Sequence, residues 1–273
     1  MQRPLIVVTN DDGIDSDGLW AAVAALVPLG QVLVVAPDRQ WSGAGRSMPH
    51  DVTGALTQTL RHVDGQAVPA YAIDATPALC VVHAMIEFVP RKPDLVVSGI
   101  NFGENISTEV TISGTIGAAL EAAAFGVPGM AVSLEMSLEN HLADSTGTDY
   151  GAGQAFTTYF ANRILNAQLP PDVDVLNINI PIQATHNTPW RVTRLSRHRY
   201  FVPVEPDRKH GCGRPGYAVM GDLEQVERDS DIWALRVART VSVTPLSMDI
   251  TSRCDFGSVE HKLRTAWRDG AAS

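Results

Sequence analysis

The chain of 273 residues has few cysteines and no long apolar run, and both features limit the kinds of protein that it can be. Its three cysteines, Cys80, Cys212 and Cys254, are too widely spaced for a CxxC metal or redox motif. An odd, scattered set of cysteines is typical of proteins in a reducing compartment. No apolar stretch reaches the ~18 residues that a membrane span requires. Because no signal peptide precedes the first apolar run, we expect a cytoplasmic protein without membrane contact.

Basic residues are also fewer than acidic ones. The chain carries 21 Lys and Arg against 30 Asp and Glu, a formal net charge of -9. A nucleic-acid binder needs a basic face, so we expect no nucleic-acid partner. The first turn, Asn10–Gly13, also lacks the G-x-G-x-x-G pattern. A dinucleotide-dependent oxidoreductase requires that pattern there, and this sequence therefore does not favour one.

Short β-branched runs alternate with helical patterns over most of the chain. The predicted strands are Leu5–Thr9, Gln31–Ala36, Asp94–Ser98, Gly129–Leu134 and Val173–Ile180. The predicted helices are Leu19–Val27, Thr76–Phe88, Ser113–Phe125 and, approximately, Gly153–Leu165. The stretch 37–75 shows no clear period and is interpreted as irregular. This alternation predicts a Rossmann-like, three-layer α/β core around a mostly parallel sheet.

The composition changes near Trp190, where Arg, Pro and Gly become frequent. We assign residues 1–190 to the α/β core and residues 191–273 to a protruding C-terminal hairpin and extension of the same domain. Strand-like runs occur at Ala234–Val237 and Thr240–Thr244, and a final helix is predicted at about Ser258–Trp267.

Three unusual loops follow predicted strands. The first contains Asp11 and Asp12, the second spans residues 36–46 and includes Ser42, and the third begins at Ser98 and contains Asn101 and Asn105. Ligands of open parallel sheets bind outside the carboxyl ends of the strands. We therefore expect these loops to converge on one rim of the sheet.

The residue types in these loops suit a hard divalent cation. Two carboxylates, a hydroxyl and a side-chain amide offer only oxygen, which Mg²⁺, Mn²⁺ and Ca²⁺ prefer. A cation would also offset the repulsion between Asp11 and Asp12. The plainer interpretation, two aspartates that merely solvate a turn, is weakened by the convergence of the loops. Ser113, Gly114 and Thr115 open a predicted helix, whose backbone N–H groups could hold a phosphate.

Several segments together resemble the SurE (survival protein E) family of metal-dependent 5′-nucleotidases. The matching segments are, in chain order, VTNDDGI, APDRQWSGAG, DATPALC, DLVVSGINFGEN, SGTIGAALEAAAFGVP and RVTRLSRHRY. They cover most of the chain in family order. The resemblance implies a Rossmann-like core with a protruding C-terminal part that is exchanged between subunits, giving a homodimer or homotetramer.

By this resemblance, Asp11, Asp12, Ser42 and Asn101 correspond to the ligands of one divalent metal ion, Mg²⁺ or Mn²⁺, with Ca²⁺ as a further candidate. Asp11, Asp12 and Asn101 are also the candidate catalytic groups. The candidate phosphate and substrate residues are Asn105, Ser113, Gly114, Thr115 and Arg46. Arg46, Glu109 and Ile112 depart from the residues common in the family, but no proposed metal ligand is replaced.

The expected activity is hydrolysis of a nucleoside 5′-monophosphate to nucleoside and phosphate. The cation would bind a phosphate oxygen and lower the pKa of water, and Asn101 with the amides of residues 113–115 would stabilise charge on the phosphate. The sequence leaves open whether water or an Asp carboxylate attacks phosphorus. Further candidates for contacts with substrate or a neighbouring subunit are Arg39, Arg194, Arg197 and Arg199, whereas His50 and His198 are not assigned a role.

Two other classes of protein share part of this pattern. A receiver-type signalling domain also pairs acidic residues after its first strand, but it needs an Asp at the end of the third parallel strand, where this chain has Ser98 and Gly99. A non-catalytic nucleotide sensor that keeps the metal site is the remaining alternative. Only a measurement of turnover distinguishes it from the enzyme.

Overall fold

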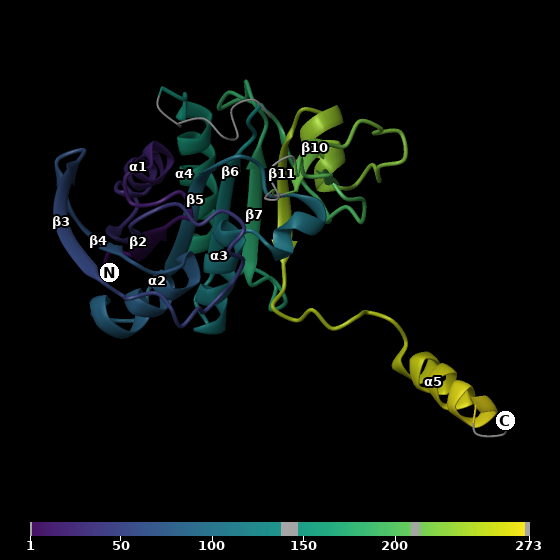
Figure 1. Ribbon diagram of the computed structural model, residues 1–273. Helices are drawn as coiled ribbons and strands as arrows, with labels where there is room; N and C mark the ends of the chain where they lie inside the picture. Colours follow the sequence, from purple (N-terminus) through teal and green to yellow (C-terminus); the bar gives the residue numbers. More distant parts are fainter. Residues whose placement is uncertain (1, 138–146, 209–212, 214, 271–273) are drawn as a thin grey trace.

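The structure, a computed structural model, describes residues 2–137, 147–208, 213 and 215–270. Within them a central sheet is built from β1 (Leu5–Thr9), β2 (Gln31–Pro37), β3 (Leu56–Val63), β4 (Gln66–Ile73), β5 (Leu95–Phe102), β6 (Gly129–Leu134), β7 (Val175–Ile180), β8 (Trp190–Val192) and β11 (Val241–Leu246). The spatial order is β3-β4-β2-β1-β5-β6-β7-β11-β8 (Figure 1). Every neighbouring pair from β4 to β7 is parallel, which confirms the predicted α/β fold.

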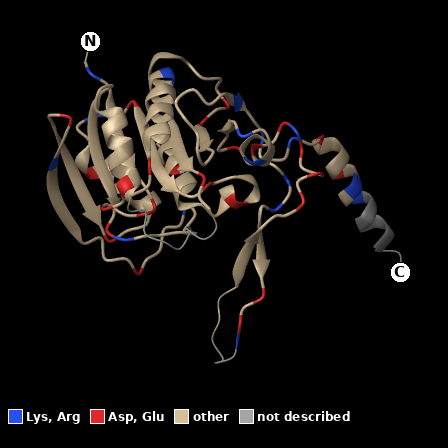
Figure 2. Ribbon diagram, turned by 90° about the horizontal axis from the view of Figure 1, so that it is seen from above, with Lys and Arg blue, Asp and Glu red and all other residues tan. Residues whose placement is uncertain are grey.

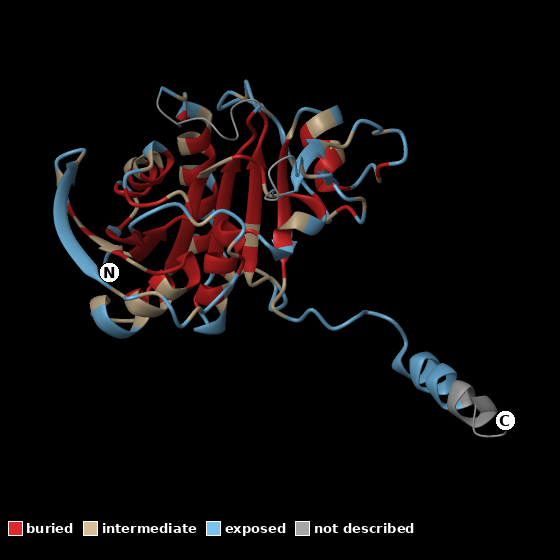
Figure 3. Cartoon of the chain, in the orientation of Figure 1, coloured by how far each residue is buried: buried red, intermediate tan, exposed pale blue. Residues whose placement is uncertain are grey.

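Helices cover both faces of this sheet and make three layers. They are α1 (Asp17–Leu26), α2 (Pro77–His83), α3 (Gly114–Ala124) and α4 (Gly151–Asn166). Alternate residues of β1 point to opposite sides: Ile6 and Val8 join the core cluster under α1 and α4, whereas Val7 joins the cluster that contains α2 and part of α3. Because both faces are covered, the central strands are buried along their length (Figure 3).

The predicted helix Thr76–Phe88 begins as expected, with the Thr76 hydroxyl accepting from the N–H of Leu79 and Pro77 in the first turn. It continues after α2 as a π-helical turn, Ala84–Phe88. The prediction of an irregular stretch before it was wrong in part, because β3 and β4 form a hairpin there. Asp64 and Gly65 turn the chain with positive φ angles of 47° and 78°. An Asp-Gly pair is a strong local signal for such a turn.

The chain after residue 190 returns to the central sheet as well as leaving it. β11 pairs antiparallel with β7 and parallel with β8. The prediction of a strand at Ala234–Val237 was wrong, because this segment lies in the π-helical turn Trp233–Val237. A short apolar run such as this does not distinguish strand from helix, since its period cannot be measured.

Two elements stand away from the body of the molecule. The hairpin of β9 (Phe201–Val204) and β10 (Gly216–Val219) forms a separate two-stranded sheet that projects beyond the core (Figure 2). The helix α5 (Phe256–Gly270) lies at the end of an extended segment (Figure 1). No helix in the described residues is long and apolar enough to cross a membrane.

Candidate functional site

Asp11 and Asp12 lie in the tight turn that follows β1. The Asn10 side chain closes this turn, donating from Nδ2 to the Gly13 carbonyl at 2.9 Å and accepting from the Gly13 N–H at 3.2 Å. The N–H of Trp41 donates to the Asp11 carbonyl at 2.7 Å. The first loop and the loop after β2 are therefore joined directly, as the sequence predicts for loops at one rim.

The two carboxylates are held where ionisation is unfavourable. Burial raises the pKa of Asp11 to about 6, although the hydrogen bond from Thr115 Oγ1 to Oδ1, at 2.6 Å, opposes the shift. Burial and then the Asp11 charge raise the pKa of Asp12 to about 7, against the hydrogen bond from the Phe102 N–H at 3.1 Å. A cation beside this pair would remove the electrostatic cost of having both carboxylates ionised.

The other two predicted metal ligands face the same cavity as Asp11. It has a volume of about 360 Å³, and Ser42 and Asn101 are among its lining residues. Asn101 donates from Nδ2 to the Gly103 carbonyl at 2.7 Å, so its Oδ1 is the end of the amide suited to a cation. A shift in the pairing of β5 with β6, between Ser98 and Asn101, sets the position of this side chain at the strand end.

The donor set fits a hard divalent ion. The described residues contain no cluster of three or more His, Cys, Asp or Glu side chains, so a thiolate or imidazole site of the zinc type is not formed by them. Asp11, Asp12, Ser42 and Asn101 supply carboxylate, hydroxyl and amide oxygens instead, the ligands that Mg²⁺, Mn²⁺ and Ca²⁺ prefer.

The predicted phosphate turn packs directly against Asp11. Ser113 caps α3, its Oγ accepting from the Ile116 N–H at 3.2 Å. A Cβ atom on Gly114 would lie 2.8 Å from Asp11 Cβ, so only glycine permits this approach. With Thr115 bonded to Asp11, the N-terminus of α3 adjoins the candidate metal carboxylate, where its N–H groups favour an anion.

Asn105 extends this network across the sheet. It donates from Nδ2 to Thr115 Oγ1 at 3.2 Å and to Ser133 Oγ at 2.9 Å. Its backbone N–H donates to Asn179 Oδ1 at 2.7 Å, and its carbonyl accepts from the Asn177 and Asn179 side chains. Sequence reasoning missed these supporting asparagines, although two buried polar residues spaced two apart in the apolar strand β7 are the signal that could have indicated them.

The candidate arginines are placed very differently from one another. Arg46 does not line the cavity: its Nε lies 2.6 Å from Glu121 Oε2 on α3. Arg39 pairs with Asp38 and Asp74, and Arg194 pairs with Asp229. Arg199 does line the cavity, 3.8 Å from Glu109. The cavity-lining residues include neither Arg197 nor the two histidines left without a role, His50 and His198.

A further wall of the cavity comes from the β9–β10 hairpin, whose residues sequence reasoning did not connect to the site. The residues of this wall are Phe201, Pro203, Pro215, Gly216 and Tyr217. No local pattern indicates this contact, because the hairpin is about a hundred residues away in sequence from Asn101 and Asn105. The cavity thus runs from Asp11 to an apolar, aromatic surface.

Comparison with known proteins agrees with this geometry. The family model for survival protein SurE matches residues 6–202. The chain is 45% identical over 263 residues to the 5′-nucleotidase SurE of Thermococcus gammatolerans, covering 94% of this chain and 95% of that protein. It is 42% identical over 267 residues to the 5′-nucleotidase SurE of Methanosarcina mazei, covering 95% and 98%.

A solved structure gives the same result for the fold. The crystal structure of the SurE protein from Aquifex aeolicus superimposes with a TM-score of 0.71 at 31% identity, covering 91% of this chain and 95% of that one. The family model matches well over half of the chain, the relatives match nearly all of it, and a SurE crystal structure shares its fold. The chain therefore belongs to the SurE family.

Proposed function

We propose that this chain is a divalent-metal-dependent 5′-nucleotidase that hydrolyses nucleoside 5′-monophosphates to nucleoside and phosphate. One observation carries the proposal: Asp11, the neighbour of Asp12, adjoins the N-terminus of α3 through the bond from Thr115 and lines a cavity of about 360 Å³. A site for a cation and a site for a phosphate are thereby contiguous. The names of relatives that match nearly the whole chain support this activity.

Each residue type has a separate role in the proposed mechanism. Asp11, Asp12, Ser42 and Asn101 would hold the metal ion, which when bound neutralises phosphate charge and lowers the pKa of water. The N–H groups at the start of α3 and the Asn101 amide would stabilise the charge that develops on the phosphate oxygens. A carboxylate of the aspartate pair has the chemistry to accept a proton from attacking water.

The test is phosphate release from nucleoside 5′- and 3′-monophosphates with Mg²⁺, Mn²⁺ or EDTA. We expect release only with metal, and a loss of at least about a hundredfold in Asp12→Asn, because one ligand charge is removed. Asp15→Asn is the matched control, since Asp15 is exposed and pairs with Arg61 outside the cavity. Nucleotide binding without phosphate release in the presence of any of these metals would identify a nucleotide sensor and overturn the proposed enzymatic activity.

We further propose that α5 joins copies of this chain into a homodimer or homotetramer. Phe256, Val259 and Leu263 are exposed on α5 and line one shallow groove. Spacings of three and four residues place them on one face of the helix. An apolar stripe on a helix held away from its own core needs a surface to cover it.

The scattered cysteines also support a reducing compartment, and the cytoplasm is the proposed location.

A further inference from the structure

The aromatic wall of the cavity contains none of the residues proposed to hold the metal or the phosphate. It belongs to the β9–β10 hairpin, whereas the candidate metal and phosphate residues come from the loops after β1 and β2, from β5 and the loop that follows it, and from the start of α3. Phe201 lies on β9 and Tyr217 on β10, and Tyr217 pairs with Pro203, two residues from Phe201. Side chains in this diagonal relation share one face of a hairpin, and here that face lines the cavity.

The two rings form a defined surface. Their centroids are 5.2 Å apart and their planes meet at 76°, an edge-to-face contact. Tyr217 is 43% exposed, so part of its ring remains open to the cavity. Glu104 lines the cavity together with Tyr217. Burial and then the charge of Glu104 raise the pKa of Tyr217.

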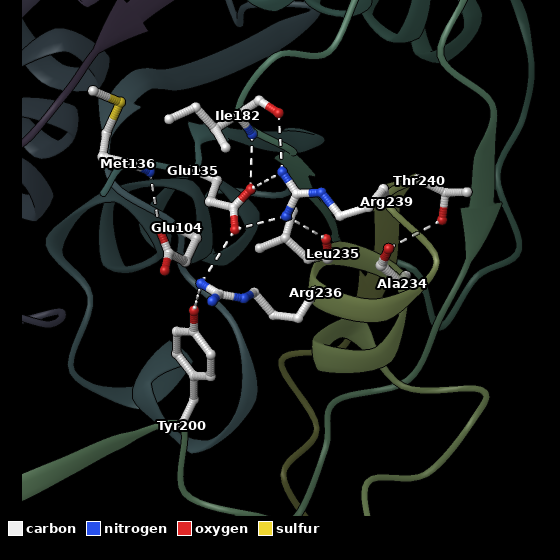
Figure 4. Close-up of polar contacts among 10 residues, drawn as sticks. All are labelled: Glu104, Glu135, Met136, Ile182, Tyr200, Ala234, Leu235, Arg236, Arg239 and Thr240. Atoms are coloured by element: carbon white, nitrogen blue, oxygen red, sulfur yellow. Dashed lines mark hydrogen bonds and ion pairs between the residues drawn. The ribbon is translucent and has the colours of Figure 1, made fainter. Parts of the chain in front are cut away.

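The hairpin is anchored where this surface begins. Tyr200, which precedes Phe201, is fully buried, and the two ring centroids are 4.7 Å apart. The Tyr200 hydroxyl accepts from Arg236 Nη1 at 2.6 Å, and Arg236 lies 3.3 Å from the buried Glu135 carboxylate (Figure 4). The carbonyl of Tyr200 accepts from the N–H of Met220 and closes the base of the hairpin. The aromatic wall is therefore largely formed before any ligand arrives, which reduces the entropy lost on binding.

We propose that Tyr217, supported by Phe201, is a specificity-determining residue that stacks against the base of the nucleotide, an inference that rests on the proposed function. A phosphate at the start of α3 leaves the rest of the ligand to extend along the same cavity toward the hairpin. An exposed aromatic face opposes a flat heterocycle without reading its hydrogen-bonding edge. The wall thus recognises that a base is present and tolerates different bases.

The experiment compares a phosphate ester that has a base with one that lacks it. Adenosine 5′-monophosphate and ribose 5-phosphate are supplied to the wild type, Tyr217→Ala, Tyr217→Leu and Tyr217→Phe, and turnover is measured with Mg²⁺ or Mn²⁺. Val202→Ala is the matched control, because Val202 is exposed on the partner strand β9 of the same hairpin and does not line the cavity. Affinity for both ligands is measured in parallel by calorimetry with EDTA, when no metal-dependent turnover occurs.

We expect kcat/KM for adenosine 5′-monophosphate to fall about five- to a hundredfold in Tyr217→Ala and Tyr217→Leu, mainly through KM, because base–aromatic stacking has this magnitude. The value of kcat/KM for ribose 5-phosphate should change by less than about twofold. Tyr217→Phe should keep the wild-type kcat/KM for adenosine 5′-monophosphate, since the ring is kept. If Tyr217 had only a structural role, its loss would lower kcat/KM for both substrates by the same factor.

Equal losses of kcat/KM for both substrates would overturn the proposal that Tyr217 stacks against the base. Equal affinity of the wild type for both ligands would overturn it as well. A different outcome would separate the two proposals. The wild type could bind adenosine 5′-monophosphate more tightly than ribose 5-phosphate, with this difference lost in Tyr217→Ala, and yet hydrolyse neither ligand. That result would support stacking of the base on Tyr217 and reject the proposed function. The two proposals therefore fail through different readouts.

Discussion

Gly114 is where the candidate phosphate turn packs against Asp11, one of the candidate metal carboxylates. A methyl group there would lie 2.8 Å from Asp11 Cβ and 2.9 Å from its Oδ2. Asp11 has little room to retreat, because it is buried and held by Thr115. We predict that Gly114→Ala displaces this carboxylate, weakens metal binding at least about tenfold and lowers kcat/KM about a hundredfold.

Metal titration and steady-state kinetics on the same preparation test this prediction. Gly221→Ala is the control, since nothing lies within 4 Å of a Cβ at Gly221 and its backbone has no positive φ. Normal metal affinity in Gly114→Ala would show that the turn and the carboxylate are not coupled.

Arg46 is expected from the sequence to contact substrate, but its side chain is engaged elsewhere. Its Nε bonds to Glu121, whose side chain is 8% exposed. We predict that Arg46→Ala lowers the free energy of unfolding by about 1 kcal/mol, because a nearly buried carboxylate loses its partner while Arg46 itself is partly solvated. KM should change by less than about twofold. A large rise in KM with unchanged stability would restore Arg46 to the substrate site.

Among the structural elements, the loop that carries Ser42 is held to the end of β4 by Asp74. Asp74 accepts from the Thr53 hydroxyl at 2.6 Å and its N–H at 3.0 Å, and from Arg39 at 2.6 Å. These bonds lower the pKa of Asp74 to about 2. A depressed folded-state pKa contributes stability that is complete above the unfolded value near 4 and is lost as pH falls toward 2.

We therefore predict that the wild type exceeds Asp74→Asn in stability at about pH 5 and that this difference shrinks steadily between about pH 4 and pH 2. Urea unfolding of both proteins across that range gives the measurement. A difference that stays constant with pH would mean that ionisation of Asp74 does not contribute to holding the loop.

A second junction between elements depends on Asp231. Its buried carboxylate accepts from the backbone N–H groups of Ser107, Ser196 and Ile232 at 2.6–2.9 Å. We predict that Asp231→Ala lowers the free energy of unfolding by about 2–4 kcal/mol, because three N–H groups lose their acceptor. Asp229→Ala should cost less than about 0.5 kcal/mol, since Asp229 pairs with Arg194 in the open. Equal effects in a urea titration would contradict this assignment.

At the scale of the whole molecule, the cavity is separate from α5, the helix proposed to join copies of the chain. Every residue that lines the cavity comes from the described part of a single chain, between Asp11 and Tyr217, whereas α5 begins at Phe256. We predict that Leu263→Glu lowers the oligomeric state, because it places a charge on the apolar stripe of α5. Analytical ultracentrifugation measures the mass, and His261→Glu at a neighbouring exposed position controls for charge alone. An unchanged mass would exclude α5 from the assembly.

The sequence alone determined the alternation of strands and helices, the adjacent carboxylates after β1 and the Ser113–Thr115 helix start. These features depend on residues only a few positions apart, and their place at strand ends follows from the period of the apolar pattern. Parallel pairing then makes the convergence of Asp11, Asn101 and Thr115 predictable, since the carboxyl ends of parallel strands share one rim.

Only the tertiary structure decided which distant groups meet. Arg46 pairs with Glu121 from 75 residues away, although other acidic groups are available in the sequence. Likewise, Phe201 and Tyr217 reach the cavity because Tyr200 and Arg236 anchor the hairpin beside the core. A local pattern states how a segment folds, but the partner of a side chain depends on the three-dimensional path of the chain, which composition and period do not encode.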